Sequence, residues 1–161
     1  NYIKELDDLE IILPLGGGSE DRWKVPKVGY LKVNFDAAFW QTETISCSAE
    51  AMTCTMAMKL CLDLGLRRLV VEGDSLTWIK KVKLSEVDKS KISAYIEDIK
   101  KMGIKVLSCI FMHVQRSANI VVHQLASEGL RLNLGFFWLN GVSEFAEEMV
   151  EQVRCWVEAS D

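Results

Sequence analysis

The sequence predicts an α/β fold built on a parallel sheet of about three strands that helices flank. Its 161 residues are 49% hydrophobic and 26% charged, the balance of one globular domain with a core. Segments with strand periodicity alternate with segments of helical periodicity, as in sheets whose parallel strands are joined by helices. The segment Leu66–Gly73 contains the run Leu69-Val70-Val71, which has no polar face and is typical of a strand covered on both sides.

The first predicted element of the sheet is a strand, Tyr30–Asp36. Its residues alternate in polarity, so Lys32, Asn34 and Asp36 are expected to share one face. The following segment, Phe39–Ile45, is rich in aromatic and β-branched residues and indicates one extra short strand.

The clearest helix in the sequence is Ser48–Leu64, which has hydrophobic residues at helical spacing and Gly65 placed to end it. Glu50 is expected in its first turn, where the helix dipole favours a carboxylate. After the strand Leu66–Gly73, Ser75 is placed to cap a short helix. The remaining predicted elements are the helices Leu76–Val82 and Ile92–Met102, the latter stopped by Gly103, the strand Ile104–Phe111, and the helices Asn119–Leu130 and Ser143–Val157.

These elements divide the chain into three predicted regions. Residues 1–22 are expected to be a peripheral segment with a glycine-rich linker, residues 23–140 form the α/β domain, and residues 141–161 form an amphipathic helix. The five cysteines contain no close Cys-x-x-Cys pair and are expected to be buried thiols in a reducing compartment. No signal peptide and no apolar run of membrane-spanning length is evident, which predicts a soluble intracellular protein of the nucleus or the cytoplasm with no membrane partner.

The charge of the chain limits how it could bind nucleic acid. The net charge is -4 and the sequence pI is about 5.3, which argues against a strong non-specific grip on phosphates. Binding through metal ions, or through a local basic patch such as Lys80–Lys91, remains compatible with this charge.

Three carboxylates are expected to meet at one rim of the sheet. Asp36 and Asp74 each end a strand, and Glu50 begins the helix between those strands. Like charges held together are costly unless their pKa values rise or a divalent cation binds, and oxygen ligands suit Mg²⁺ or Mn²⁺. The alternative is that both Asp residues are turn residues and that Glu50 only favours the start of its helix.

Five segments in order resemble the plant RNase H-like domains that non-LTR retrotransposons often leave. The resemblance runs from about Trp23 to Trp138. The matching segments are Trp23-Lys24-Val25-Pro26, Leu31-Lys32-Val33-Asn34-Phe35-Asp36, Ala49-Glu50-Ala51, Val70-Val71-Glu72-Gly73-Asp74-Ser75 and the run from His113 to Ala126, which follows the pattern H-V-x-R-x-x-N-x-x-A-H-x-L-A.

The resemblance implies a ribonuclease H-like fold and metal-dependent cleavage of the RNA strand of an RNA–DNA hybrid. Position by position, Asp36, Glu50 and Asp74 match the metal-binding carboxylates. His123 stands where catalytic relatives outside plants usually carry a fourth Asp; it could bind a metal or relay a proton, or it could be a helix-surface residue with no role. His113 is expected to be structural.

The chain departs from the family just after Asp36. Only 13 residues separate Asp36 from Glu50, where the family normally has two more strands as a hairpin. Their absence would make the first strand an exposed edge of a truncated sheet. Ala37 also replaces a usual glycine, which makes close approach of a substrate to the backbone less easy.

Three functions are therefore compatible with the sequence. The first is an RNA–DNA hybrid ribonuclease that uses Mg²⁺ or Mn²⁺ and carries Asp36, Glu50, Asp74 and His123 as its catalytic residues. The second is an inert, truncated descendant that binds nucleic acid or another partner without turnover. The third, a metal hydrolase of small phosphate esters, has only the acidic cluster in its favour.

Overall fold

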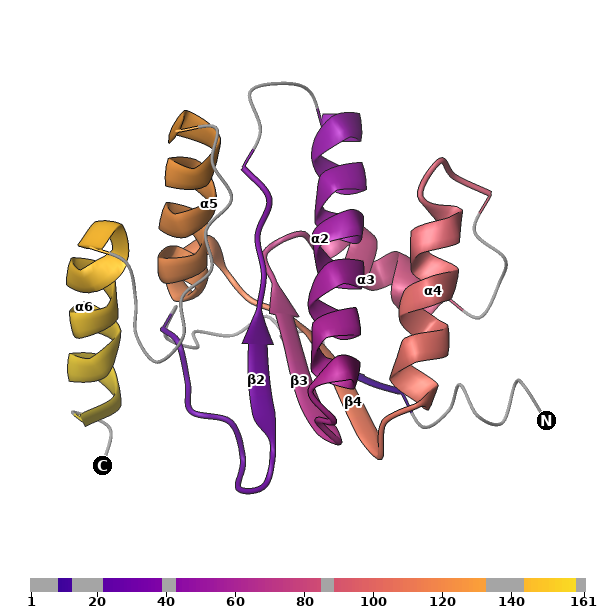
Figure 1. Ribbon diagram of the computed structural model, residues 1–161, viewed down its shortest axis with the longest axis horizontal. Helices are drawn as coiled ribbons and strands as arrows, with labels where there is room; N and C mark the ends of the chain where they lie inside the picture. The colour runs from indigo at the N-terminus through magenta and orange to yellow at the C-terminus, as the bar shows by residue number, and fades with distance from the viewer. Residues whose placement is uncertain (1–8, 13–21, 39–42, 85–88, 133–143, 159–161) are drawn as a thin grey trace.

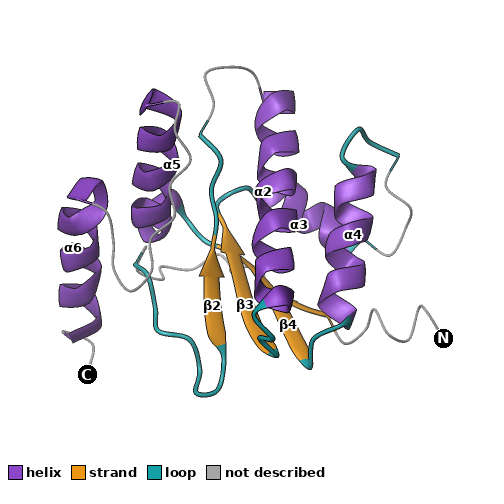
Figure 2. Ribbon diagram, in the orientation of Figure 1, coloured by secondary structure: helices purple, strands orange, loops and turns teal. Residues whose placement is uncertain are grey.

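The computed structural model of the chain describes residues 9–12, 22–38, 43–84, 89–132 and 144–158. In these ranges all strands belong to one parallel sheet in the order β1-β4-β3-β2, with helices packed around it (Figures 1 and 2). The strands are β1 (Leu9–Ile12), β2 (Leu31–Asn34), β3 (Arg68–Gly73) and β4 (Ser108–His113). The predicted α/β fold with a parallel sheet is confirmed.

The inner strand β3 has β2 on one side and β4 on the other. Leu69 and Val71 are fully buried and Val70 is 4% exposed, so both faces of this strand are covered. The unbroken hydrophobic run therefore reflects burial on both sides, as its sequence predicts.

The additional strand of the sheet does not come from the segment that the sequence favours. Leu9–Ile12, within the segment expected to be peripheral, pairs with β4. Glu43–Ile45, the last part of the expected strand, instead begins a helix, while residues 39–42 lie outside the described ranges. The strand prediction for Glu43–Ile45 is wrong, because a helix gains a backbone hydrogen bond for each residue that it adds, which outweighs a weak local preference for strand.

Five α-helices and two short 3₁₀ turns lie in the described ranges, the turns directly before α5 and α6. They are α2 (Glu43–Asp63), α3 (Leu76–Lys83), α4 (Ser93–Ile104), the turn Arg116–Asn119, α5 (Ile120–Leu132), the turn Glu144–Ala146 and α6 (Glu147–Glu158).

Three predicted boundaries are wrong: the start of α2, the end of α4 and the start of β4. α2 begins five residues before Ser48, although it ends as predicted before Gly65, whose φ of 71° suits the left-handed turn there. Gly103 does not stop α4: it is buried within the helix, so β4 begins at Ser108 and not at Ile104. The low helix propensity of glycine is a weak preference, which the structure around a helix can override.

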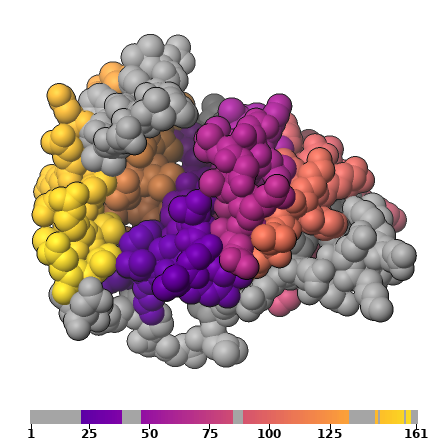
Figure 3. Space-filling model, turned by 60° about the horizontal axis from the view of Figure 1, so that its bottom comes forward, coloured from indigo at the N-terminus to yellow at the C-terminus, as the bar shows by residue number. Residues whose placement is uncertain are grey.

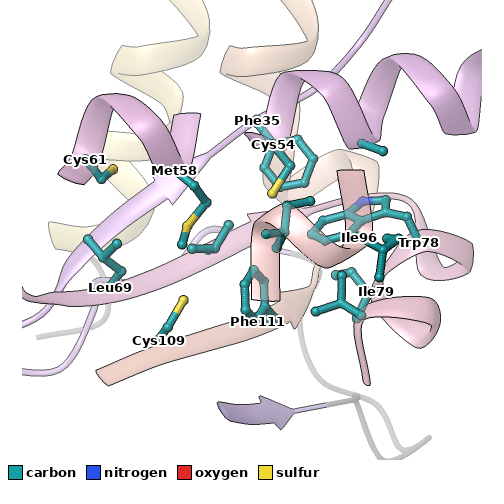
Figure 4. Close-up of a cluster of buried hydrophobic side chains, with 14 of the residues drawn as sticks. Phe35, Cys54, Met58, Cys61, Leu69, Trp78, Ile79, Ile96, Cys109 and Phe111 are labelled. Atoms are coloured by element: carbon teal, nitrogen blue, oxygen red, sulfur yellow. The ribbon is translucent and has the colours of Figure 1, made fainter. Parts of the chain in front are cut away.

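The hydrophobic core lies between the sheet and the helices α2, α3 and α4. Trp78 of α3 is fully buried, with its ring centroid 5.0 Å from that of Phe35 and 6.1 Å from that of Phe111 (Figure 4). Buried side chains of α2, among them Cys54 and Met58, complete this layer (Figure 4). The core therefore fixes the end of β2 against the end of β3, where the carboxylates follow.

The helices α5 and α6 stand together beyond β2, apart from the other three (Figure 1). Val33 and Phe35 of the β2 region face the core, whereas Asn34 between them contacts Asn119 directly before α5. α5 therefore begins on the opposite face of the sheet. α6 packs against α5, and the predicted C-terminal helix is confirmed over Glu147–Glu158.

The hairpin that the resemblance implies between β2 and the first helix has no room in this chain. Residues 35–38 are neither strand nor helix. Only residues 39–42, which lie outside the described ranges, separate them from α2. Among the residues that the structure describes, β2 is therefore the last strand on its side of the sheet. Leu31 is 52% exposed, and Figure 3 shows the segment that carries β2 at the surface between α6 and α2.

None of the helices in the described part of the chain is long and apolar enough to cross a membrane. The division into regions 1–22, 23–140 and 141–161 stays a prediction.

Candidate metal centre

Three carboxylates come together at the carboxyl end of the sheet. Asp36 follows β2 by two residues and Asp74 follows β3 directly, and parallel pairing brings these two strand ends side by side. One ligand oxygen from each of Asp36, Glu50 and Asp74 lies within 4.8 Å of the other two. The predicted convergence of these residues is present in the structure.

Glu50 reaches the cluster by a different route from the one expected. α2 begins at Glu43, so Glu50 lies about two turns inside the helix and not in its first turn. In Figure 1, α2 starts beyond the tips of the strands and runs back along the sheet, so its interior residues lie nearer the strand ends than its first turn does. The helix dipole therefore does not explain why a glutamate stands at this position.

All three carboxylates are largely removed from water. Asp36 and Glu50 are each 7% exposed as residues, and the side chain of Asp74 is also 7% exposed. Negative charges held this close in a partly desolvated site repel one another strongly. The cluster therefore needs positive charge or hydrogen-bond donors around it.

Asp36 receives two close contacts. The backbone N–H of Ala37 donates to its Oδ1 at 2.7 Å, and Nδ1 of His123 lies 2.6 Å from its Oδ2. His123 projects from the first turn of α5, and its side chain is 34% exposed. The structure thus places the fourth candidate residue against the cluster and not on an unrelated surface of the helix.

Asp74 is held by the last residue of β4 and by a residue of the turn that follows it. Nε of Arg116 lies 3.0 Å from Asp74 Oδ2, and Nε2 of His113 lies 3.1 Å from the backbone oxygen of Asp74. His113 is paired in register with Gly73, so β4 itself positions this histidine. Its contact is with the backbone, as expected for a structural residue. Arg116 belongs to the motif run, but sequence reasoning assigned it no role.

A buried polar network lies beneath the cluster, on the face shared by Lys32, Asn34 and Asp36. Glu72 is 2% exposed and accepts contacts from Lys32 Nζ at 2.7 Å and Asn34 Nδ2 at 2.9 Å. Asn34 Nδ2 also donates to Asn119 Oδ1 at 3.1 Å, and Asn119 Nδ2 donates to the backbone oxygen of Phe35 at 3.0 Å. The network ties β2, β3 and the start of α5 together, which fixes His123 relative to the carboxylates.

Sequence reasoning found only part of this network. Strand alternation correctly placed Lys32 and Asn34 on the face of Asp36. Asn119 was expected to cap a helix, and it does precede α5, but its side chain contacts the strands instead. The sequence of β3 contained a signal for Glu72, since an acidic residue within a buried strand requires a compensating partner.

The close packing of Gly73 against Phe35 positions the two aspartates. A Cβ atom at Gly73 would lie 2.5 Å from Cζ of Phe35, which is closer than non-bonded atoms approach. Phe35 precedes Asp36 and Gly73 precedes Asp74, so the absence of a side chain at Gly73 lets the two strand ends approach.

The donor set fits a small divalent cation. Mg²⁺ takes oxygen ligands at about 2.0–2.1 Å, so ligands on opposite sides of the ion lie about 4.2 Å apart. One oxygen from each carboxylate lies within 4.8 Å of the other two, close to this upper limit for two ligands of one ion. Mn²⁺ prefers similar oxygen ligands, so the geometry does not choose between the two ions.

Comparison with known proteins assigns most of these elements to one family. A family model described as reverse transcriptase-like matches residues 29–129, more than half of the chain. The matched range begins just before β2 and ends within α5, so it includes the three carboxylates and His123. None of the curated proteins compared with the chain matches it.

Proposed function

Because this chain belongs to the reverse transcriptase-like family, whose domains are RNase H-like, we propose that it is a metal-dependent ribonuclease of RNA–DNA hybrids. Asp36, Glu50 and Asp74 would hold one or two Mg²⁺ or Mn²⁺ ions. The meeting of these three carboxylates at one rim of the sheet carries the proposal, since a structural role for them would not require this juxtaposition. An origin in a plant retrotransposon stays a prediction.

The chain's own residues would position the reaction. A divalent cation at this centre would supply Lewis-acid stabilisation of the charge that develops on the phosphate. Glu50 is held by the middle of a long helix, and Asp36 and Asp74 by two paired strands, so the ligand atoms are fixed before substrate binds. His123, 2.6 Å from Asp36, is placed to hold that carboxylate and to give or take a proton beside the centre.

The test is cleavage of a labelled RNA–DNA hybrid in Mg²⁺ by the wild-type chain and by Asp74→Asn. This variant keeps the shape of the side chain but removes a negative charge from the centre. We expect the wild type to produce RNA fragments. The cleavage rate of the variant should be at least about 100-fold lower, as when a principal electrostatic contributor to catalysis is removed. Equal product from both proteins, or product from neither, would contradict the catalytic proposal.

A second candidate function is that of a catalytically inert nucleic-acid-binding module. The observation in its favour is the direct passage from β2 to α2, because the family reads its substrate partly through the segment that is missing here. RNA is distinguished from DNA by its 2′-OH, which requires well-placed protein partners. This candidate predicts hybrid binding in EDTA that weakens with salt, through exposed lysines such as Lys80 and Lys91, without turnover.

A further inference from the structure

Arg116 and Asp74 form an ion pair at the candidate metal centre, and their side chains differ in exposure to solvent. The side chain of Asp74 is 7% exposed, whereas that of Arg116 is 67% exposed, and the contact joins Nε to Oδ2 at 3.0 Å. Arg116 begins the short turn between β4 and α5 and reaches the cluster from the solvent side. Its guanidinium can therefore move into water without leaving a cavity in the core.

The charge of the whole cluster acts on this arginine. The pKa of the Arg116 guanidinium is raised, first by its hydrogen bond to Asp74 and further by the charges of Asp74, Asp36 and Glu50. Its positive charge thus partly neutralises the carboxylates, which is also what a bound cation would do. Two cations at the same carboxylate would repel each other.

We propose that Arg116 is a displaceable counter-ion, which pairs with Asp74 in the metal-free protein. A divalent cation must then displace Arg116 from Asp74 in order to bind. The inference rests on the metal-binding role proposed above. The alternative is that Arg116 orients Asp74 for metal binding. The two roles predict opposite effects of removing the arginine: competition predicts tighter metal binding, and orientation predicts weaker binding.

The first test is calorimetric titration of Mn²⁺ into the wild type, Arg116→Gln and Arg116→Lys, without nucleic acid. We expect Arg116→Gln to bind Mn²⁺ about fivefold more tightly than the wild type, because the cation no longer has to break the ion pair. This factor is the upper end of the range for exposed ion pairs, and we choose it because Asp74 is shielded from water. Arg116→Lys keeps the competing charge and should bind Mn²⁺ much as the wild type does.

Arg131→Gln is the matched control. Nε of Arg131 lies 2.7 Å from Oε2 of Glu128, and its side chain is 61% exposed, so it resembles Arg116 in exposure and in the atom it uses. Both residues of this pair lie in α5, and neither belongs to the carboxylate cluster. Its removal should leave Mn²⁺ affinity unchanged.

A second measurement follows the arginine directly. In a nitrogen-15 spectrum of arginine Nε–H groups, the signal that Arg116→Gln lacks should move towards the position of solvent-exposed arginines when Mg²⁺ is added. If the wild type binds Mn²⁺, an unmoved signal would overturn this inference and leave the metal centre standing. Equal or weaker Mn²⁺ binding by Arg116→Gln would do the same. Absence of Mn²⁺ binding from all these proteins, or undiminished binding by Asp74→Asn, would overturn the metal centre and the inference with it.

Discussion

At the scale of single residues, the centre contains carboxylates that are held by different partners. Asp36 is contacted by a backbone N–H and by His123, and Asp74 by Arg116. The strand ends in the sequence were sufficient to predict that Asp36 and Asp74 would meet, whereas Glu50 was predicted from a helix start that lies elsewhere in the structure. The strand ends were not sufficient to predict the Arg116 contact, because that depends on the short turn after β4, whose geometry no periodic pattern encodes.

His123 offers a prediction at this scale. His123→Ala removes the group 2.6 Å from Asp36 Oδ2 and should lower the rate of hybrid cleavage about 10- to 100-fold, as loss of an orienting partner of a metal ligand does. His123→Asp should recover part of the rate, since an acidic residue usually occupies this place in related enzymes. The measurement is kcat in saturating Mg²⁺. An unchanged rate in His123→Ala would show that the contact is structural.

At the scale of elements, β3 and its junction with Asp74 are the best-predicted part of the chain. The hydrophobic run, the break after it and the following helix α3 were all predictable, because burial on both faces and a glycine leave clear signals. The start of α2 and the end of α4 were not predictable. In both cases the helix extends through residues that local preference assigns elsewhere, since each residue added to a formed helix gains a backbone hydrogen bond and local preference is weak.

The close contact at the end of β3 gives a prediction for this element. Gly73→Ala places a methyl group 2.5 Å from the Phe35 ring and should lower the free energy of unfolding by about 1–3 kcal/mol. The measurement is urea denaturation. The double variant Gly73→Ala with Phe35→Leu should be less destabilised than the sum of the two single variants, because the smaller side chain relieves the overlap. Strictly additive effects would contradict this account.

At the scale of the whole molecule, the three carboxylates meet at the carboxyl ends of the strands. The described part of the sheet ends at β2, where the family normally adds a hairpin. Resemblance to the family predicted the rim and the missing hairpin from the 13-residue interval between Asp36 and Glu50. It did not predict that Leu9–Ile12 would extend the sheet beside β4. That pairing is non-local, and a four-residue segment gives no indication of its partner strand.

The core of the molecule predicts how its stability depends on alkaline pH. Burial raises the pKa of the Cys109 thiol to about 12, whereas in the unfolded chain it would titrate near its usual value of about 8.5. Below that value both states hold the proton and the stabilisation is complete. Between about pH 8.5 and pH 12 only the unfolded state loses the thiol proton. The free energy of unfolding therefore falls as pH rises, by up to about 1.4 kcal/mol per pH unit for this thiol.

This dependence is measurable by urea denaturation in reducing buffer at several pH values from 8 to 10.5. Cys109→Ala should show a shallower loss of stability with pH than the wild type. Cys155 is exposed on α6, and Cys155→Ala should keep the wild-type slope. The same slope in all three proteins would show that Cys109 does not contribute to the alkaline loss.

The central claim is that Asp36, Glu50 and Asp74 together hold a divalent cation, and the most direct measurement is anomalous diffraction from crystals of the protein soaked in Mn²⁺. The account predicts an anomalous peak among the three carboxylates, at bonding distance of about 2.0–2.2 Å from an oxygen of each and with Arg116 moved away from Asp74. Crystals that take up Mn²⁺ elsewhere, or show no peak at this rim of the sheet, would contradict it.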